Sequence, residues 1–492
     1  MKVFLYLTLF GGLGVASLNA PLVGAINCML AYFLNPVIFG PEVRYQLLTT
    51  SAFLAACLIH RPCGVDAVGR EGVLLRLLWA FLAVGALSAC WAVVSSEVAM
   101  VRIWEVAKTV LLASLLPRVL RNERHLSLLM VACVIGVWHA AFMHTFGISW
   151  GYVPGSLGRE IGVLPDAQSS VMILFVPTLF LFVIFGSTFE RVLCCCALPF
   201  VLNSIVVSYQ RTYFLALIGQ AIALLFLLPR RVSIRILPVF LVVALLYIVR
   251  LAPPDYWQWI ATIKDPEAEA SANCRLVTNE ASWQMFQDYP LGGVGYRNYP
   301  DVSPQYLDAS YLTEGRRSAH NSYLTILCET GLAGFIPWMC AFAGTIWCLR
   351  RIRRQATSTT VTRVEWLAMG IEVGLYGWFV GGLTMADHEI DPAYWFVALA
   401  VVLVRLHAKQ RQALAQPNHQ DADCTGEENG WSSEYPAVSC EALSQGQLLE
   451  QDSAGVQPSR ALEAAGPRAH THPSAFRDEA GKPLAAWRTT HG

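Results

Sequence analysis

Apolar runs bounded by charged residues, proline or glycine follow one another along most of the chain. A helix of about 20 apolar residues can cross a bilayer, and the runs predict about 12–13 transmembrane helices. We therefore expect an all-α, polytopic membrane protein with one large, partly helical exterior loop. The predicted spans are residues 3–20, 22–39, 46–60, 73–94, 99–117, 126–146, 169–188, 191–208, 212–229, 234–252, 322–349, 365–385 and 391–405.

The first two runs leave one alternative open. Pro21 separates them and Pro36 interrupts the second, so residues 22–39 are compatible with a span or with an interfacial helix. The first run carries one lysine and no clear cleavage site. We expect it to stay in the mature protein rather than act as a cleaved signal peptide.

Arginine marks alternate short loops, which by the positive-inside rule are cytoplasmic. The hydrophilic stretch 253–320 falls between two of these loops and is then exterior, which is the periplasm in a Gram-negative cell. The tail is rich in Gln, Glu, Ser and Pro and lacks apolar periodicity, so we expect it to be disordered. We predict an N-terminal transmembrane bundle (1–252), a large periplasmic loop (253–320), C-terminal transmembrane helices (321–407) and a disordered cytoplasmic tail (408–492). The arginines used are Arg118, Arg121, Arg124, Arg230, Arg231, Arg235, Arg350, Arg351, Arg353 and Arg354.

The composition excludes an ordinary soluble enzyme. Hydrophobic residues make up 55% of the 492 residues and charged residues 14%, against about 25% charged in a typical soluble domain. Lysine plus arginine and aspartate plus glutamate number 35 each, so no global basic surface favours a nucleic-acid partner.

The 14 cysteines lie mostly inside apolar runs, where thiols behave as small hydrophobic groups. The exterior loop holds a single cysteine, Cys274, and no CxxC or Cys/His cluster has zinc-ligand spacing. We predict no disulfide in this loop, no metal site and no cofactor.

The segment from His320 to Gly334 places an imidazole at the exterior mouth of a predicted span. Histidine has an unperturbed pKa of about 6.5 and can take a proton from a hydroxyl group near neutral pH. We predict that His320 is the catalytic base, supported by Asn321, Tyr323 and Glu329. Tyr323 lies three positions after His320, which puts both on one helix face, whereas Glu329 is expected in a buried network. The alternative is that His320 only caps or anchors the following helix.

Two exterior arginines are candidates for binding an anion, because a guanidinium binds phosphate bidentately and stays charged. Arg211 lies at the outer end of a span, where topology does not explain a cation; a snorkelling interfacial arginine is the simple alternative. Arg275 is expected to start a helix in the exterior loop that Pro290 ends, and a solvated surface residue is its alternative.

A third candidate cation is Lys108. Arg102, Glu105 and Lys108 follow one another at three-residue spacing on one face of a span. Buried ions must pair or face a wet cavity. An ion pair of Glu105 and a substrate site at Lys108 both fit this pattern.

Gly292, Gly293 and Gly295 follow Pro290 in the exterior loop. They resemble a dinucleotide fingerprint only superficially, since no strand precedes them. We expect a turn that folds the loop back onto the membrane.

The order and placement of these motifs resemble the O-antigen ligase and O-antigen polymerase superfamily, with the related bacterial O-oligosaccharyltransferases, over roughly residues 1–405. The resemblance rests on Arg211 at the outer start of a span, on SxxxR (Ser271–Arg275) followed by PLxGxG (Pro290–Gly295), and on HNxYLxxxxExGxxG (His320–Gly334). The segment around Arg159 and Glu160 resembles the corresponding segment in the subgroup of O-glycosylation ligases that accompany exosortase systems.

The resemblance implies a metal-independent, inverting glycosyltransferase of the bacterial inner membrane that acts in lipopolysaccharide or polysaccharide biosynthesis. Its donor would be a glycan on undecaprenyl pyrophosphate, and its acceptor a hydroxyl group of lipid A-core, a protein or another surface glycoconjugate. Arg211 and Arg275, with Lys108 as a further candidate, would hold the pyrophosphate, and His320 would serve the acceptor. The expected partners are this donor, the acceptor and membrane lipids.

Three alternatives stay open. A repeat-unit polymerase would use the same donor but extend another lipid-linked repeat. A transporter or lipid-linked glycan flippase would show charge-lined central spans, often with internal repeats. A structural membrane subunit would not depend on His320.

Overall fold

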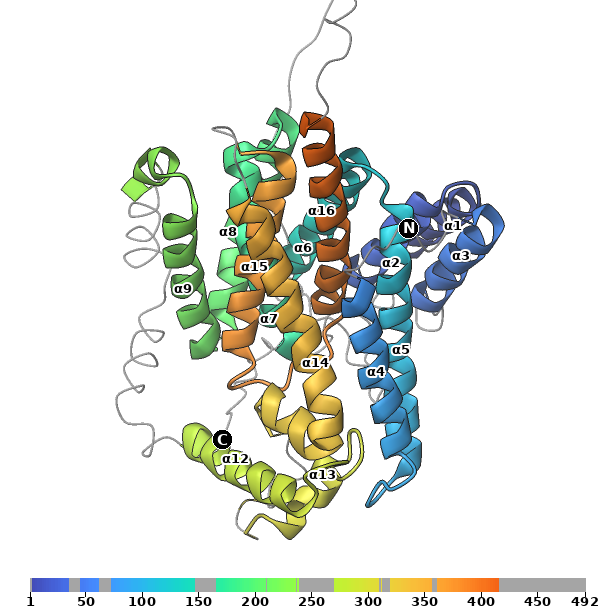
Figure 1. Cartoon of the computed structure of the whole chain (residues 1–492), viewed down its shortest axis with the longest axis vertical. Helices are drawn as coiled ribbons and strands as arrows, with labels where there is room; N and C mark the ends of the chain where they lie inside the picture. Colours follow the sequence, from blue (N-terminus) through green and yellow to red (C-terminus); the bar gives the residue numbers. More distant parts are fainter. Residues whose placement is uncertain are drawn as a thin grey trace, which may run out of the picture. The chain divides into compact units, whose positions relative to one another are not determined.

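A computed structural model describes residues 2–34, 45–61, 72–146, 165–208, 210–235, 237–238, 270–308, 311, 319–355 and 361–415. The regular elements among these residues are all helices, which confirms the predicted all-α class (Figure 1). The predicted tail from 416 onwards and Arg159 and Glu160 lie outside the described residues, whereas residues 408–415 are helical. The helices are α1 (Lys2–Asn19), α2 (Pro21–Leu34), α3 (Tyr45–His60), α4 (Val73–Ser88), α5 (Ser96–Val119), α6 (Glu123–Thr145), α7 (Pro165–Phe185), α8 (Thr188–Val207), α9 (Arg211–Leu227), α12 (Ala270–Asp288), α13 (Tyr299–Val302), η6 (Ser303–Gln305), α14 (Ser322–Arg354), α15 (Arg363–Gly381) and α16 (Asp391–Ala415).

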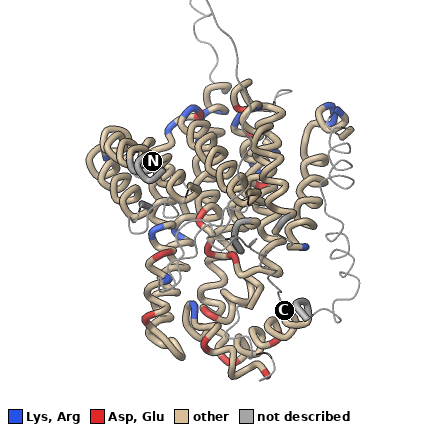
Figure 2. Tube along the Cα trace, turned by 180° about the vertical axis from the view of Figure 1, so that it is seen from behind, with Lys and Arg blue, Asp and Glu red and all other residues tan. Residues whose placement is uncertain are grey.

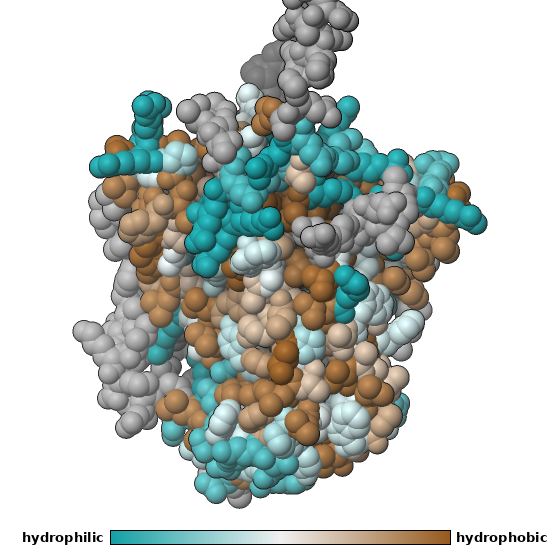
Figure 3. Space-filling view, viewed as in Figure 1, coloured by the Kyte–Doolittle hydropathy of each residue, from teal (hydrophilic) through white to brown (hydrophobic). Residues whose placement is uncertain are grey.

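Every predicted span except 234–252, most of which lies outside the described residues, coincides with a helix. In the part of the chain that the structure describes, four helices are long and apolar enough to cross a membrane: α6, α8, α14 and α16. Shorter apolar helices lie in α2, α3, α4, α7 and α9. The protein is therefore a multi-pass membrane protein. In the view of Figure 3 the sides are mainly hydrophobic, and hydrophilic residues concentrate towards the two ends.

The second predicted span is represented by α2, which ends at Leu34. Residues 35–39 of this predicted span lie outside the described residues. Gly24 lies against Phe53 of α3, and Gly136 of α6 lies against Phe33, so α2 packs tightly between these two helices.

Helix α15 lies at the centre of the packing, in contact with α7, α9, α14 and α16. Aromatic side chains fill the contact with α14 and α16: Trp338 and Phe342 of α14 meet Trp378 of α15, and Phe342 also meets Tyr394 of α16. Glycines let the helices approach, as Gly374 does against Leu174 of α7. These contacts hold α15 against α7, α14 and α16, and so determine where its two ends lie.

One end of the bundle collects charged residues and helix caps. Capping boxes at Ser187 and Thr362 start α8 and α15, and Arg363 forms an ion pair with Glu190 at 2.8 Å. Arg405 of α16 donates to the carbonyl of Pro117 at 2.6 Å. Figure 2 shows basic residues gathered towards this end. The arginine-bearing termini of α5 and α14 thus lie with the starts of α8 and α15, as expected if they share one side of a membrane.

At the opposite end, α12, α13 and η6 are the described helices of the predicted exterior loop, which is partly helical as expected. Met285, Val294, Tyr299 and Val302 make a small core of their own with Cys328 of α14. The loop therefore packs onto the first turns of α14.

Helix α14 differs from its prediction as a single continuous span. Gly331 adopts φ +61° and ψ −167°, which kinks the helix. The exterior loop inserts at this kink, because the Val294 and Gly295 amides donate to the carbonyls of Cys328 (2.9 Å) and Glu329 (3.0 Å). The kink depends on a segment distant in sequence and is invisible in the local apolar pattern.

The predicted glycine turn is confirmed. Gly293 (φ +67°) and Gly295 (φ +106°) have backbone conformations that L side chains rarely adopt. The turn also contacts the residues after α4, since Trp91 Nε1 donates to the Gly292 carbonyl (3.1 Å) and the Val93 amide to the Val294 carbonyl (3.0 Å). Helix α4 ends at Ser88, short of the predicted end at 94, and Trp91 and Val93 lie in the segment that follows it.

Candidate active site

Arg211 and His320 each stand at the start of a helix at the same end of the bundle. Arg211 is the first residue of α9 and is half-buried. His320 is half-buried and precedes the Asn321 cap of α14, with φ +48°. Positive φ is uncommon for a residue with a side chain.

Asn321, not His320, caps α14. Its Oδ1 accepts from the amides of Tyr323 (3.0 Å) and Leu324 (3.1 Å). The expectation that His320 and Tyr323 share a helix face is wrong, because His320 lies outside the helix. Tyr323 instead donates from its hydroxyl to the Phe379 carbonyl of α15 at 2.6 Å.

The loop between α15 and α16 (residues 382–390) connects the starts of α9 and α14. Thr384 shares a hydrogen bond with Thr212 (2.5 Å) and Asp387 accepts from the Tyr213 hydroxyl (2.5 Å), both in the first turn of α9. Ser322, the first residue of α14, donates from its amide to the Gly382 carbonyl at 2.8 Å. The residues next to Arg211 and His320 are therefore held by one loop.

Arg275 is half-buried in the second turn of α12. The prediction that it starts the helix is wrong, because α12 begins at Ala270. One turn later, the Thr278 hydroxyl contacts the carbonyls of Arg275 (3.1 Å) and Ala319 (3.4 Å). The helix that carries Arg275 thus touches the residue before His320.

Lys108 lies half-buried in α5, within electrostatic range of Asp391 at the start of α16. The adjacent Thr109 hydroxyl donates to Asp391 at 2.6 Å. The ion pair considered for Glu105 is present, with Arg102 at 3.1 Å. Lys108 therefore faces the α16 start, while its predicted neighbours pair with each other.

Glu329 lies in a buried network, as predicted, with 1% of its surface exposed. Its Oε1 accepts from the Tyr299 amide at 3.4 Å, and Arg297 acts on it electrostatically. Its Oε2 has no hydrogen-bond partner among the described residues.

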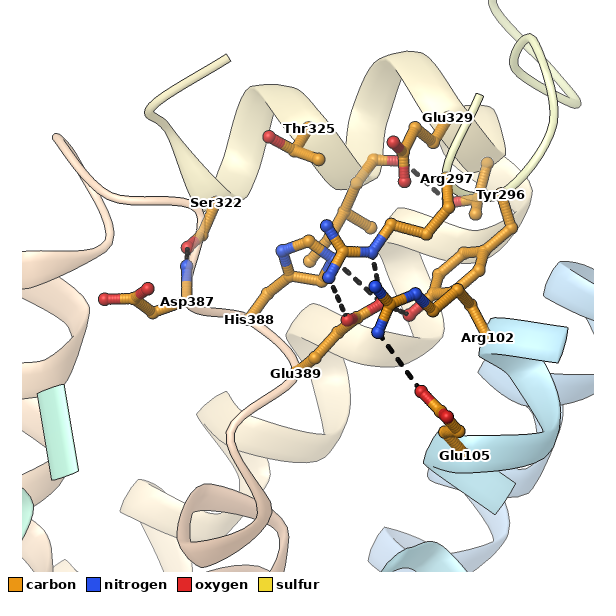
Figure 4. Close-up of polar contacts among 12 residues, drawn as sticks. Arg102, Glu105, Tyr296, Arg297, Ser322, Thr325, Glu329, Asp387, His388 and Glu389 are labelled. Atoms are coloured by element: carbon orange, nitrogen blue, oxygen red, sulfur yellow. Dashed lines mark hydrogen bonds and ion pairs between the residues drawn. The ribbon is translucent and has the colours of Figure 1, made fainter. Parts of the chain in front are cut away.

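A charged cluster that the sequence analysis did not identify lies beside this network (Figure 4). Arg297 Nε donates to Glu389 Oε1 at 3.0 Å, its second nitrogen contacts Oε2, and the Tyr296 hydroxyl donates to Oε1 at 2.5 Å. Burial alone would raise the pKa of Glu389, but Arg297, His388 and these hydrogen bonds lower it to about 2. Glu389 is therefore ionised at neutral pH.

His388, next to Glu389, is fully buried, and its ring nitrogens have no hydrogen-bond partner among the described residues. Burial is the main cause that lowers the pKa of His388 to about 4; Glu389 opposes this shift and Arg297 adds to it. Its imidazole is neutral at neutral pH. The available sequence signal was Asp387–Asp391, three carboxylates within five residues between two apolar runs.

The described residues include no group of three or more His, Cys, Asp or Glu side chains arranged to hold a metal ion. The polar groups at this end of the bundle are guanidinium groups, carboxylates, hydroxyls and imidazoles. Such a set can bind an anion and move a proton.

Residues 196–339 match the family model described as O-antigen ligase. The matched segment includes Arg211, Arg275 and His320 and ends before the α15–α16 loop. No curated protein matches the chain.

Proposed function

We propose that the protein is a membrane glycosyltransferase that moves a glycan from undecaprenyl pyrophosphate to an acceptor hydroxyl at the exterior face of the bacterial inner membrane. The observation that carries the proposal is the match of residues 196–339 to the O-antigen ligase family model, a segment that contains Arg211, Arg275 and His320. The shared anchoring of the α9 and α14 starts on one loop supports a common site for these groups.

Arg211 and Arg275 bind the donor pyrophosphate in this proposal, and Lys108 is a further candidate. The pyrophosphate gains negative charge as the bond between the anomeric carbon and its oxygen breaks. Fixed guanidinium groups stabilise that charge more in the transition state than in the ground state. The two arginines can therefore assist departure of the lipid pyrophosphate without a metal ion.

His320 takes the proton of the acceptor hydroxyl while its oxygen forms a bond to the anomeric carbon. The breaking bond leaves its electron pair on undecaprenyl pyrophosphate, so the reaction balances without a cofactor. Attack from the face opposite the phosphate inverts the anomeric configuration. Asn321, Tyr323 and Glu329 support the site by holding the helix that follows His320 and the loop around it.

The acceptor separates a ligase from a polymerase of the same family. A ligase acts on lipid A-core, a protein or another surface glycoconjugate, and a polymerase on a second lipid-linked repeat. Deletion of the gene distinguishes them: loss of ligation leaves long lipid-linked glycan, and loss of polymerisation leaves single repeats.

Transfer by purified protein in proteoliposomes, with lipid-linked donor and acceptor, tests the proposal. His320→Ala should lower transfer by about 10²–10⁴-fold, as expected for a lost general base. Arg211→Lys and Arg275→Lys keep the charge but remove the bidentate fork, and should lower transfer as well. Arg354→Lys, an exposed arginine at the far end of α14, is the matched control.

Normal transfer by folded His320→Ala protein would show that His320 is not the base. Normal transfer by Arg211→Ala and by Arg275→Ala would show that these arginines do not form the pyrophosphate site. The wild-type reaction is also run with a strong chelator. Inhibition that a divalent cation reverses would contradict the metal-free mechanism.

A further inference from the structure

The α15–α16 loop holds one residue, Asp387, that contacts the starts of two different helices. Its backbone amide donates to the Ser322 hydroxyl at 3.0 Å. Its carboxylate Oδ2 accepts from the Tyr213 hydroxyl at 2.5 Å and also contacts the Ser170 hydroxyl of α7. Figure 4 shows the Asp387 carboxylate pointing away from Ser322.

The contact with α9 is geometrically constrained. Tyr213 is fully buried, and its ring lies against Gly381, the last residue of α15. A Cβ atom at Gly381 would lie only 3.0 Å from the Tyr213 hydroxyl oxygen. The Thr212–Thr384 hydrogen bond is a second link one residue away. The first turn of α9, which begins with Arg211, is therefore fixed against the α15–α16 loop.

The contact with α14 is equally specific. Ser322 is 2% exposed, and its hydroxyl donates to the Met385 carbonyl at 2.7 Å while accepting from Asp387. Its amide donates to the Gly382 carbonyl. Ser322 follows His320 by two residues, so these bonds fix the end of the chain segment that carries the imidazole.

We propose that Asp387 is a positioning residue that sets the distance between Arg211 and His320 by binding Tyr213 with its carboxylate and Ser322 with its backbone amide. This role rests on the proposed function, in which Arg211 holds the leaving group and His320 the attacking one. Displacement of one reacting group by about 1 Å can lower a rate by 10²-fold. A link between the two groups therefore has a direct kinetic consequence.

A purely structural role of Asp387 predicts a different result. It would lower the amount or stability of folded protein and leave the kinetics of each folded molecule unchanged. A positioning role predicts that the α9 contact affects the donor and the α14 contact affects the chemical step.

The test uses purified full-length protein in proteoliposomes, normalised to folded molecules. Tyr213→Phe removes the α9 hydrogen bond and should raise the donor KM about 3–10-fold, with a matching loss of binding to undecaprenyl pyrophosphate. Ser322→Ala removes the α14 hydrogen bond and should lower kcat about 3–10-fold. Asp387→Ala removes the carboxylate but keeps the backbone amide that binds Ser322, so it should raise the donor KM as Tyr213→Phe does. Asp387→Asn, which keeps an acceptor oxygen, should partly restore donor KM.

A double variant supplies the decisive comparison. If Tyr213 acts through Asp387, the Tyr213→Phe/Asp387→Ala variant should be no worse than Asp387→Ala alone, since coupled residues are not additive. Glu372→Gln is the control, because this buried carboxylate of α15 pairs with Arg350 and Arg353 at the other end of α14. It should lower stability without changing donor KM.

Unchanged KM and kcat in Tyr213→Phe and Ser322→Ala would overturn the positioning role, as would full additivity in the double variant. These variants are mild, so failure of Asp387→Ala to fold does not decide the test. Absence of transfer by the wild-type protein would instead overturn the proposed function and this role with it.

Discussion

Arg297 and Glu389 form an ion pair between two loops that are 92 residues apart in the sequence. Their side chains are 24% and 16% exposed. Arg297 follows the glycine turn of the predicted exterior loop and has φ +59°. Glu389 lies two residues before Asp391, the first residue of α16. The pair therefore fastens the exterior loop to the α15–α16 loop beside the candidate site.

Removal of either partner should destabilise the protein, because the other charge stays largely buried without compensation. We expect Arg297→Met and Glu389→Leu each to lower the free energy of unfolding by about 3 kcal/mol. Denaturant unfolding in detergent micelles measures the loss. The double variant should recover part of it, since it leaves no unpaired charge. Equal or greater loss in the double variant would contradict this account.

Gly331→Ala should destabilise the kink of α14. A Cβ atom there would lie 2.6 Å from the Gly292 amide nitrogen, and φ is +61°. We expect a loss of more than about 1 kcal/mol, because both strain and a backbone clash oppose alanine. Thermal unfolding in detergent measures it. Gly219→Ala in α9, where a Cβ atom meets nothing within 4 Å, is the control and should stabilise slightly.

Local apolar pattern was sufficient to predict the helices but not their interruptions. The run 126–146 corresponds to α6, because a chain in lipid satisfies its backbone groups within the helix. The kink at Gly331 and the early end of α4 at Ser88 both arise where the loop at Gly292–Gly295 binds backbone groups. Such contacts depend on residues far apart in the sequence, which no local period records.

The candidate site was predictable by residue type and less so by local structure. His320, Arg211 and Arg275 were identified from motif and position, and their roles stay predictions. The helix phase assigned to His320 was wrong because Asn321 is a strong N-cap and starts α14 after it. Asp387 and Glu389 were visible as carboxylates, but their partners Tyr213 and Arg297 are brought to them only by the fold.

Acidification should destabilise the protein through His388. Its pKa is lowered from 6.5 to about 4, so the folded state binds fewer protons than the unfolded state between these values. Stability therefore falls as the pH drops from 6.5 towards 4, by up to about 3 kcal/mol. Glu389, with a pKa lowered from 4.5 to about 2, adds a further loss below pH 4.5.

Melting temperatures in detergent between pH 4 and 8 measure this dependence. His388→Gln cannot titrate and should show a shallower slope between pH 4 and 6.5 than the wild type. An identical slope in the two proteins would show that other groups cause the loss.

His320 and Asn321 are adjacent, and their substitution should separate catalysis from helix capping. His320→Gly suits φ +48° and should change the free energy of unfolding by less than about 1 kcal/mol, while transfer collapses. Asn321→Ala removes the cap of α14 and should cost about 1 kcal/mol, with transfer per folded molecule reduced far less than in His320→Gly. Asn321→Ser, which retains a good capping side chain, should restore most of the stability. Thermal unfolding and proteoliposome transfer on the same preparations measure both properties. Stability loss in His320→Gly with normal transfer per folded molecule would instead assign His320 an anchoring role.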